Sequence, residues 1–223
     1  MGMRCNTLYN NVLTLLLGLL IINAVRDFSE DARRIADVFL RLSEVLGSAA
    51  TTAARSQGLS ALQLQIISLL ARRGTSEPIS YFARRFMIST ATVSDSIRVL
   101  EQNGLVTKTR QKGDSRTVHV AITEIGREAV TSSAIWVENL RNIVAGWDER
   151  RRAEVFPALL EIIDGPRIEG MVPVDRMCVA CRYLAINCDV GESAAPHYCR
   201  ILNIRMQTLD LRLDCPEFEP VAR

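Results

Sequence analysis

The sequence lacks the short motifs that identify common enzyme classes. It contains no Gly-rich phosphate-binding loop, no His-Glu-x-x-His metal motif and no nucleophile elbow. It also contains no internal repeats. Its most hydrophobic stretch, residues 12–22, is shorter than the about 20 residues that a membrane-spanning helix needs. These absences argue against an enzyme, a repeat protein and a membrane-spanning protein, and we expect no stable membrane association.

Residues 1–26 form an apolar extension whose role the sequence leaves open. Arg4 precedes the apolar run as in a signal peptide, but the small-residue cleavage pattern that should follow is missing. Three interpretations stand. The run extends a buried dimerisation helix, comes from a start site assigned too far upstream, or acts as a weak membrane anchor.

The average composition conceals two local features. With 223 residues, 48% apolar and 23% charged, the chain is an ordinary globular protein, which excludes a disordered chain and a collagen-like fibre. Residues 55–123 hold ten Lys and Arg against four acidic residues, a net of +6, whereas the whole chain carries +2. Five of the six cysteines fall in the last 46 residues. A solvated arginine face and buried apolar thiols are the ordinary explanations, so each feature needs a more specific argument.

The hydrophobic periodicity predicts a mainly α protein with one β-hairpin, an α+β winged helix-turn-helix. Ser60 and Gln63 have the spacing of a helix-opening capping box, and Thr123 and Asp148 are also suited to cap helices. Gly165-Pro166 marks a linker. We therefore divide the chain into the extension 1–26, a domain 27–166 and a cysteine-rich module 171–223. The expected helices cover 31–52, 60–74, 79–86, 90–102, 123–147 and 148–164, and the expected hairpin strands cover 105–109 and 117–122.

The expected helix over residues 90–102 has the pattern of a recognition helix. Val93, Ile97 and Leu100 recur at i, i+4 and i+7 and would anchor the helix to a core. Short hydroxyl side chains and one arginine on the other faces can bond phosphates and base edges without bulk. The candidate DNA-binding residues of this helix are Thr90, Thr92, Ser94 and Arg98.

The hairpin tip adds Arg110, Lys112 and Arg116 as candidate DNA-binding residues. A thin basic loop of this kind can enter the minor groove, where arginine is favoured by the negative potential. Double-stranded DNA is therefore the expected partner.

The residues around the hairpin resemble the MarR-type winged-helix transcription regulators. The resemblance covers about residues 30–165 and rests on Leu100-Glu-x-Asn-Gly104-Leu-Val-x-Lys108, then Asp114-x-Arg116, then Ile122-Thr123-x-x-Gly126. It implies an obligate homodimer with intertwined first and last helices and with each fourth helix in a major groove. It also implies that Asp114 orders the wing. Lys108 departs from the arginine usual in the family and lacks its bidentate fork.

A homodimer also agrees with the apolar surface of the expected end helices. A two-fold dimer would read a pseudo-palindromic operator with half-sites about one helical turn apart. We expect a cytoplasmic transcription regulator that acts as a repressor. The residues that need cover are Trp136, Leu140, Ile143, Val144, Trp147, Phe156, Leu159, Leu160 and Ile163.

The C-terminal cysteines have the spacing Cys178-x2-Cys181-x6-Cys188-x10-Cys199-x15-Cys215. A Cys-x2-Cys turn supplies half of a tetrahedral sulfur site, and two distant cysteines can supply the rest. We select Cys178, Cys181, Cys199 and Cys215 as metal ligands, with Cys188 and His197 in reserve or beside the ligands. Zinc is slightly favoured over an iron–sulfur cluster, for which Cys215-Pro216 is a weak signal. Redox-switch thiols and inert thiols are alternatives, whereas stable disulfides are disfavoured in a reducing cytoplasm.

Two control mechanisms and one rival class remain. The metal or redox state of the cysteines controls DNA binding, or a small effector such as an aromatic acid does so while the tail is only a structural zinc site. The peroxide-sensing cysteine of the family's first helix does not carry over, because residues 27–177 contain no cysteine. A metal or thiol enzyme using Glu217 and Glu219 beside Cys215 is the remote alternative.

Overall fold

The computed structural model describes residues 28–111, 114–168, 176–188 and 195–221. The expectations for residues 1–26 and for Lys112 lie outside these ranges. The chain divides into two compact units, one of residues 41–148 and one that joins the first 40 residues to residues 149–223. The long first helix passes through both units, because it runs from residue 30 to residue 56.

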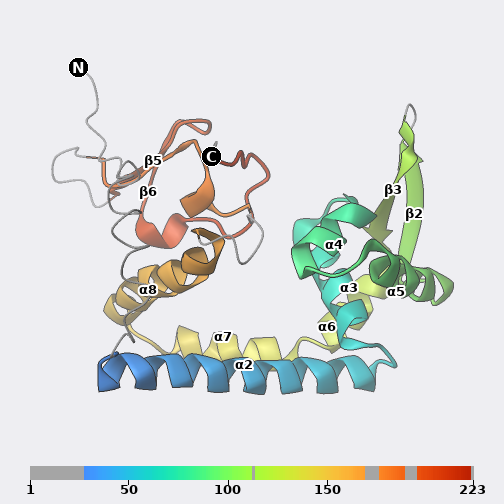
Figure 1. The fold of residues 1–223 in the computed structure, drawn as a ribbon, viewed down its shortest axis with the longest axis horizontal. Coiled ribbons are helices and arrows are strands. Elements are labelled where there is room, and N and C mark those ends of the chain that lie inside the picture. The colour runs from blue at the N-terminus through green and yellow to red at the C-terminus, as the bar shows by residue number, and fades with distance from the viewer. Residues whose placement is uncertain (1–27, 112–113, 169–175, 189–194, 222–223) are drawn as a thin grey trace. The chain divides into compact units, whose positions relative to one another are not determined.

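The unit of residues 41–148 is a winged helix. A β-hairpin follows directly on the helix pair α4–α5, and β3 lies between β1 and β2 in an antiparallel sheet. Figure 1 shows β2 and β3 extending past the helices of their own unit. In chain order the elements are α2 (Glu30–Ser56), α3 (Ala61–Arg73), β1 (Glu77–Pro78), α4 (Ile79–Phe86), α5 (Thr90–Gln102), β2 (Val106–Gln111), β3 (Asp114–Ile122), α6 (Glu124–Ser132) and α7 (Ile135–Ala145).

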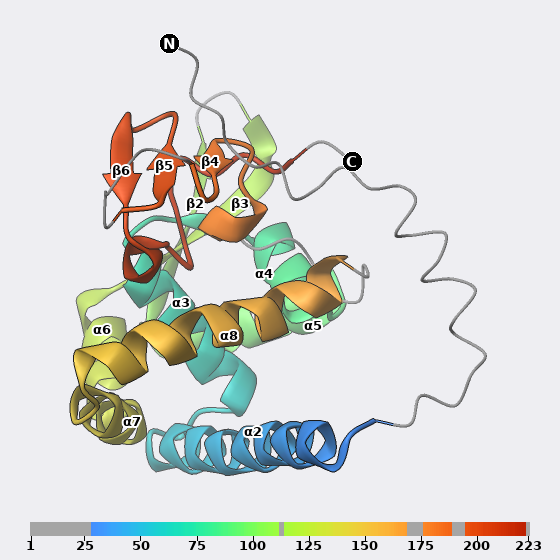
Figure 2. The same ribbon diagram turned by 90° about the vertical axis from the view of Figure 1, so that its left-hand side faces the viewer.

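The other unit contains α8 (Glu149–Ile168) and the cysteine module, by which we mean residues 176–188 and 195–221. The module has three short antiparallel strands in the order β4-β5-β6, which lie side by side in Figure 2. Both of its 3₁₀ turns contact α8. The elements are η1 (Cys178–Ala180), β4 (Leu184–Ala185), β5 (His197–Cys199), β6 (Ile204–Met206) and η2 (Thr208–Asp210).

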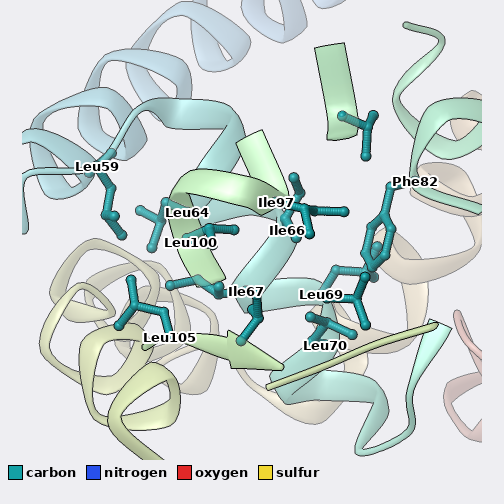
Figure 3. Packing of buried hydrophobic residues seen from close by; sticks show 14 of the residues in the cluster. Leu59, Leu64, Ile66, Ile67, Leu69, Leu70, Phe82, Ile97, Leu100 and Leu105 are labelled. Carbon is teal, nitrogen blue, oxygen red and sulfur yellow. The ribbon is translucent and has the colours of Figure 1, made fainter. Parts of the chain in front are cut away.

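The core of the winged helix forms around α3. Ile66, Ile67 and Leu70 of this helix are fully buried, and α4, α5 and the hairpin pack against them (Figure 3). The three predicted anchors of α5, Val93, Ile97 and Leu100, are also fully buried. Burial of such side chains stabilises a fold by about 1.5–3 kcal/mol each, so one apolar face fixes the orientation of α5.

Local signals in the sequence set several boundaries as predicted. Ser60 accepts a hydrogen bond from the Gln63 N–H while the Gln63 side chain accepts one from the Ser60 N–H, so the capping box is present. Thr123 accepts from the Gly126 N–H and caps α6. The helices α4 and α5 have the predicted bounds, and the mainly α winged-helix fold is confirmed.

The predicted helix over residues 123–147 is interrupted. It forms α6 and α7, with a break at Ser133–Ala134. The hydroxyls of Thr131, Ser132 and Ser133 donate to the carbonyls of Arg127, Glu128 and Ala129, each four residues back. Such bonds compete with the backbone ladder and bend helices, which accounts for the break.

Other elements also differ from the prediction, including the hairpin strands, which cover 106–111 and 114–122 where 105–109 and 117–122 were predicted. The first helix continues to Ser56, four residues past the predicted end at 52. The short strand β1 was not predicted, because Glu77-Pro78 has no strand pattern of its own and pairs only through β3. The predicted linker at Gly165-Pro166 lies inside α8, which ends at Ile168. A proline lacks an N–H and therefore removes one hydrogen bond from the last turns, without ending this helix.

None of the helices in the described ranges combines the length and the apolar character that crossing a membrane requires.

Candidate functional site

The turn between α4 and α5 sets the position of the recognition helix. Met87 ends α4 in the left-handed conformation, with φ of 55°, and the Ile88 N–H donates to the Ala83 carbonyl at 3.0 Å. Ser89 then caps α5 by accepting from the Thr92 N–H at 3.1 Å. The chain thus turns from one helix into the next within three residues, as in a helix-turn-helix.

The candidate residues of α5 lie outside the face that carries its buried anchors. Thr90, Thr92 and Arg98 are exposed, and Ser94 is half-buried. The Ser94 hydroxyl donates to the Thr90 carbonyl at 2.8 Å, which leaves its oxygen as an acceptor. Arg98 forms an exposed ion pair with Asp95 one turn earlier. Thr90, Ser94 and Arg98 follow one another at four-residue spacing and share one side of the helix, whereas Thr92 lies on another side, where its hydroxyl is 2.8 Å from the Ser89 hydroxyl.

The wing begins at a tightly packed base. The Thr123 hydroxyl donates to the Gly104 carbonyl at 2.7 Å, which connects the start of α6 to the turn after α5. A Cβ atom on Gly126 would collide with the Leu105 carbonyl oxygen and with the Ile122 side chain. The hairpin is therefore attached to α5 and α6 through close backbone contacts.

Lys108 connects the wing to the recognition helix. Its ammonium lies 2.7 Å from the Glu101 carboxylate at the C-terminal end of α5, and the two side chains are 28% and 41% exposed. Farther along β2, Arg110 is exposed opposite Val118 of β3. Arg116 lies within β3, but its side chain, like Lys112, falls outside the described part of the structure.

The sequence-based site omitted the basic residues of α3 and α4. Arg84 lies exposed in the last turn of α4, next to the turn that precedes α5. Arg73, in contrast, is buried beside Glu77, at 2.7 Å, and stacks on the Tyr81 ring. Arg84 and Arg73 each add one positive charge, so the net charge does not distinguish the exposed residue from the buried one. The amphipathic pattern of α4 is the one sequence signal that could have shown Arg84 to be exposed.

A pocket of about 560 Å³ lies within the winged-helix unit. Apolar side chains from α3, α6 and α7 line it, including Leu69, Val130 and Leu140. Arg72, Arg85 and Arg141 also line this pocket. An apolar cavity with basic groups suits a small organic anion.

Backbone hydrogen bonds bring the four selected cysteines together from separate segments. The Cys178 N–H donates to the Arg212 carbonyl and the Cys215 N–H donates to the Arg176 carbonyl, so these two segments run alongside each other. Cys181 follows on the η1 turn, and the Leu184 N–H donates to its carbonyl. Leu184 pairs across the sheet with Cys199. All four thiols are free, and those of Cys178, Cys199 and Cys215 are buried.

The surroundings of Cys178 disfavour the charged form of its thiol. Burial raises the pKa of Cys178, and the charges of Cys215, Cys181 and Cys199 raise this pKa further. The Arg212 N–H, which donates to the Cys178 sulfur at 3.2 Å, opposes these effects. A bound cation would reverse the balance, because it stabilises the thiolate form.

The four thiols do not close on one point. Among the residues that the structure describes, no three His, Cys, Asp or Glu side chains stand together as ligands of a single metal ion. The selected set is therefore a neighbourhood of thiols rather than a formed tetrahedral site.

His197 and Cys188 are buried in the same module. His197 is 6% exposed, and burial lowers its pKa. Its Nε2 lies 3.2 Å from the Thr208 hydroxyl, whereas its buried Nδ1 has no hydrogen-bond partner among the residues that the structure describes. His197 and Cys199 are both buried on β5, two residues apart, so their side chains share one face of the sheet. Cys188 is 5% exposed and is disulfide-bonded, so it is not the reserve ligand that the sequence suggested, and the expectation that disulfides are disfavoured does not hold for it.

Glu219, cast as a proton shuttle in the enzyme alternative, has other contacts. Its carboxylate lies 3.5 Å from Arg182 and accepts a hydrogen bond from Tyr183, whose pKa it raises. These exposed contacts give no support to a catalytic acid beside the thiols.

Part of the chain is similar to known transcription regulators. Residues 57–117 match the model of the MarR family. The uncharacterised HTH-type transcriptional regulator YwhA of Bacillus subtilis (strain 168) is 29% identical over 98 residues, which are 44% of this chain and 68% of YwhA. These similar proteins are transcription regulators, in agreement with the prediction that the chain is not an enzyme.

Solved structures share the fold. FabT of Streptococcus pneumoniae in complex with DNA has a TM-score of 0.54 at 18% identity, covering 61% of this chain and 97% of FabT. MepR of S. aureus in its DNA-binding conformation has a TM-score of 0.52 at 17% identity, covering 59% of this chain and 97% of MepR. At this level of identity the likeness concerns the fold alone.

Proposed function

We propose that this chain, which carries the winged helix of a MarR-type DNA-binding transcription regulator, acts in the cytoplasm as a homodimer on double-stranded DNA. The observation that carries the proposal is the orientation of α5. Val93, Ile97 and Leu100 fix one face in the core, which leaves Thr90, Thr92 and Arg98 exposed outside that face. An exposed polar helix followed by a projecting hairpin is complementary to a major groove and the adjacent minor groove.

In this arrangement α5 reads bases and the surrounding cations position the protein. Arg98 can form a bidentate contact with guanine once it leaves Asp95. Arg84 on α4 is placed to bind a phosphate, because the first helix of a helix-turn-helix crosses the backbone. Arg110, with Lys112 and Arg116 beyond it, supplies the wing contact.

Exposed apolar side chains on the end helices support the homodimer. On α2, Ile35, Val38, Leu42 and Val45 recur at helical spacing and are 57%, 65%, 40% and 53% exposed. Ile143 of α7 and Ile163 of α8 are also exposed. A second copy of the chain would cover such faces and would match a pseudo-palindromic operator. We expect repression, because a bound dimer covers promoter DNA.

Binding-site selection from a random duplex library with the full chain tests this function. We expect one pseudo-palindromic sequence, and the absence of any enriched sequence would overturn the proposal. With the selected duplex, fluorescence anisotropy at several salt concentrations gives the number of phosphate contacts. Arg110→Ala should lower the slope of log affinity against log salt by about 0.9 for each lost contact in a protomer.

Lys108→Ala is the matched control for this measurement. It removes a charge from the same strand, but Glu101 already neutralises that charge. The slope should therefore change less than in Arg110→Ala. Equal changes in the two variants would contradict the assignment of Lys108 as a support of the wing.

The pocket of about 560 Å³ favours a second candidate, control by a small aromatic acid. In this version Arg72 or Arg141 binds the carboxylate, Leu69 and Leu140 contact the ring, and the cysteine module is only a structural zinc site. Benzoate is a suitable probe. Release of the selected duplex by benzoate, lost in Arg72→Ala, would support this candidate, and unchanged affinity at saturating benzoate would exclude it for this probe.

A further inference from the structure

We propose that Asp95 of α5 is a specificity-determining residue that selects a cytosine in each half-site, beside the guanine bound by Arg98. This role rests on the proposed function, because Asp95 can meet a base only where α5 lies in a major groove. Asp95 is not among the candidate residues that the sequence indicated. Its role follows from its position on the helix and from the hydrogen bonds that the hydroxyl side chains of α5 make.

Asp95 lies on the face of α5 that is opposite the buried anchors. A helix turns by about 200° over two residues, and Asp95 is two residues from both Val93 and Ile97, which are fully buried. Its side chain therefore points away from the core and is 67% exposed. A helix in a major groove brings this face closest to the base edges. The exposed row along the face consists of Ala91, Asp95, Arg98 and Gln102.

The hydroxyl side chains of α5 are held close to the helix. The Ser94 hydroxyl donates to the Thr90 carbonyl at 2.8 Å. The Thr92 hydroxyl lies 2.8 Å from the hydroxyl of Ser89, the residue that caps α5. A hydroxyl that is bonded to its own helix or to the cap stays near the backbone. The carboxylate of Asp95 is therefore better placed to reach a base edge than these hydroxyls are.

Asp95 and Arg98 form an ion pair one turn apart, and both side chains are exposed. An exposed pair of this kind is weak, so the guanidinium can leave it for a stronger contact with DNA. Arg98 has several N–H donors and binds the O6 and N7 atoms of a guanine with two of them. The carboxylate of Asp95 is then brought next to this guanine and needs a donor from a neighbouring base.

The chemistry of a carboxylate limits the bases that Asp95 can accept. An ionised carboxylate accepts hydrogen bonds and donates none. In the major groove thymine presents O4 and guanine presents N7 and O6, all of which are acceptors and repel a carboxylate. Adenine presents its N6 amino group beside the acceptor N7, whereas cytosine presents its N4 amino group alone. Cytosine is therefore the base that suits Asp95.

The same carboxylate weakens binding to other sequences. Where no cytosine faces Asp95, its charge meets only phosphates and base acceptors, which it repels. Exposed basic residues such as Arg84 and Arg110 attract any duplex, whatever its sequence. Asp95 thus contributes discrimination between sequences rather than affinity for DNA.

Binding-site selection with the full chain and with Asp95→Asn tests this role. An asparagine amide both donates and accepts, and it pairs with N6 and N7 of adenine. We expect the unaltered protein to enrich cytosine at one position of each arm and Asp95→Asn to enrich adenine there, with the other positions unchanged. Because Asp95 is exposed, the substitution does not disturb the core.

The other outcomes of the selection are distinguishable. The same enriched sequence from both proteins would overturn the role of Asp95 and leave the proposed function intact. Loss of the guanine preference in Asp95→Asn, with the cytosine retained, would mean that Asp95 only orients Arg98 and would overturn the cytosine contact. The absence of any enriched sequence with the unaltered protein would overturn the proposed function itself.

Affinities for two duplexes measure the size of the effect. The unaltered protein should bind the selected duplex about tenfold more tightly than a duplex in which a T·A pair replaces the C·G pair. Asp95→Ala should bind the two duplexes almost equally and should bind unrelated DNA more tightly than the unaltered protein does. Glu124→Ala is the control, because it removes an equal exposed charge from α6. Its preference should persist, and an equal loss of preference in both variants would contradict the contact.

Discussion

At the residue scale, not every basic side chain counted in residues 55–123 is available to contact DNA. Arg73 is buried against Glu77, Lys108 is paired with Glu101, and Arg98 contacts Asp95. The first two pairs hold elements together, and only the third is exposed enough to exchange its partner for DNA. The net charge of +6 therefore overstates the electrostatic contact with DNA, which rests on side chains such as Arg84 and Arg110.

Gly126 provides a residue-scale prediction. Because an added Cβ would collide with the Leu105 backbone, Gly126→Ala should destabilise the winged helix by about 1–3 kcal/mol. Chemical denaturation followed by circular dichroism measures the change. Gly47→Ala is the control, since nothing lies near its added Cβ and alanine in a helix should stabilise by about 0.5–1 kcal/mol. Equal stability of the two variants would show that the wing base can relax.

At the element scale, the features that depend on a few neighbouring residues could be predicted from the sequence. The capping box at Ser60, the anchors of α5 and the hairpin each depend on short spacings, and each is present. The strand β1 depends on pairing with the distant β3, and the break before α7 depends on three hydroxyls that turn toward the backbone. Neither outcome has a periodic signal in the sequence.

The candidate site was likewise predictable where it depends on short spacings and not predictable where it depends on contacts between distant residues. The spacing of Val93, Ile97 and Leu100 was enough to leave Thr90, Thr92 and Arg98 for the other faces of α5, and all three are exposed. The role of Lys108 was not predictable, because its partner Glu101 lies on another element. The four cysteines were selected by their spacing, but the backbone pairing between residues 176–178 and 212–215 that brings two of their segments together has no signal in that spacing.

The buried pair between α3 and β1 gives an element-scale prediction. Arg73 and Glu77 are 4% and 12% exposed and 2.7 Å apart. Glu77→Ala should leave the Arg73 charge buried without its carboxylate and cost about 3–5 kcal/mol. The exposed pair of Arg41 and Glu44 is the control, because Glu44→Ala should cost less than about 1 kcal/mol. Urea denaturation compares the two, and similar losses would contradict the structural role of the buried pair.

At the scale of the whole molecule, the exposed face of α2 predicts association. Val38 is 65% exposed at the middle of the apolar row on this helix. Val38→Glu should shift the protein from dimer to monomer in sedimentation equilibrium and weaken binding to the palindromic duplex. Asp37→Ala, on an adjacent polar position, should leave the dimer intact. A Val38→Glu protein that remains fully dimeric would place the interface elsewhere.

The ion pair between Lys108 and Glu101 has a consequence for how an operator is measured. Together with the packing of Gly126 on Leu105, it keeps the wing and the recognition helix of one protomer at a fixed separation. Bases within a half-site are then read by a rigid body, so an inserted base pair inside a half-site separates the two groove contacts. A base pair inserted between the half-sites changes the distance between the two protomers, and only the contact between the protomers has to adjust. Operator variants should therefore tolerate changes at the centre of the palindrome better than changes within either arm.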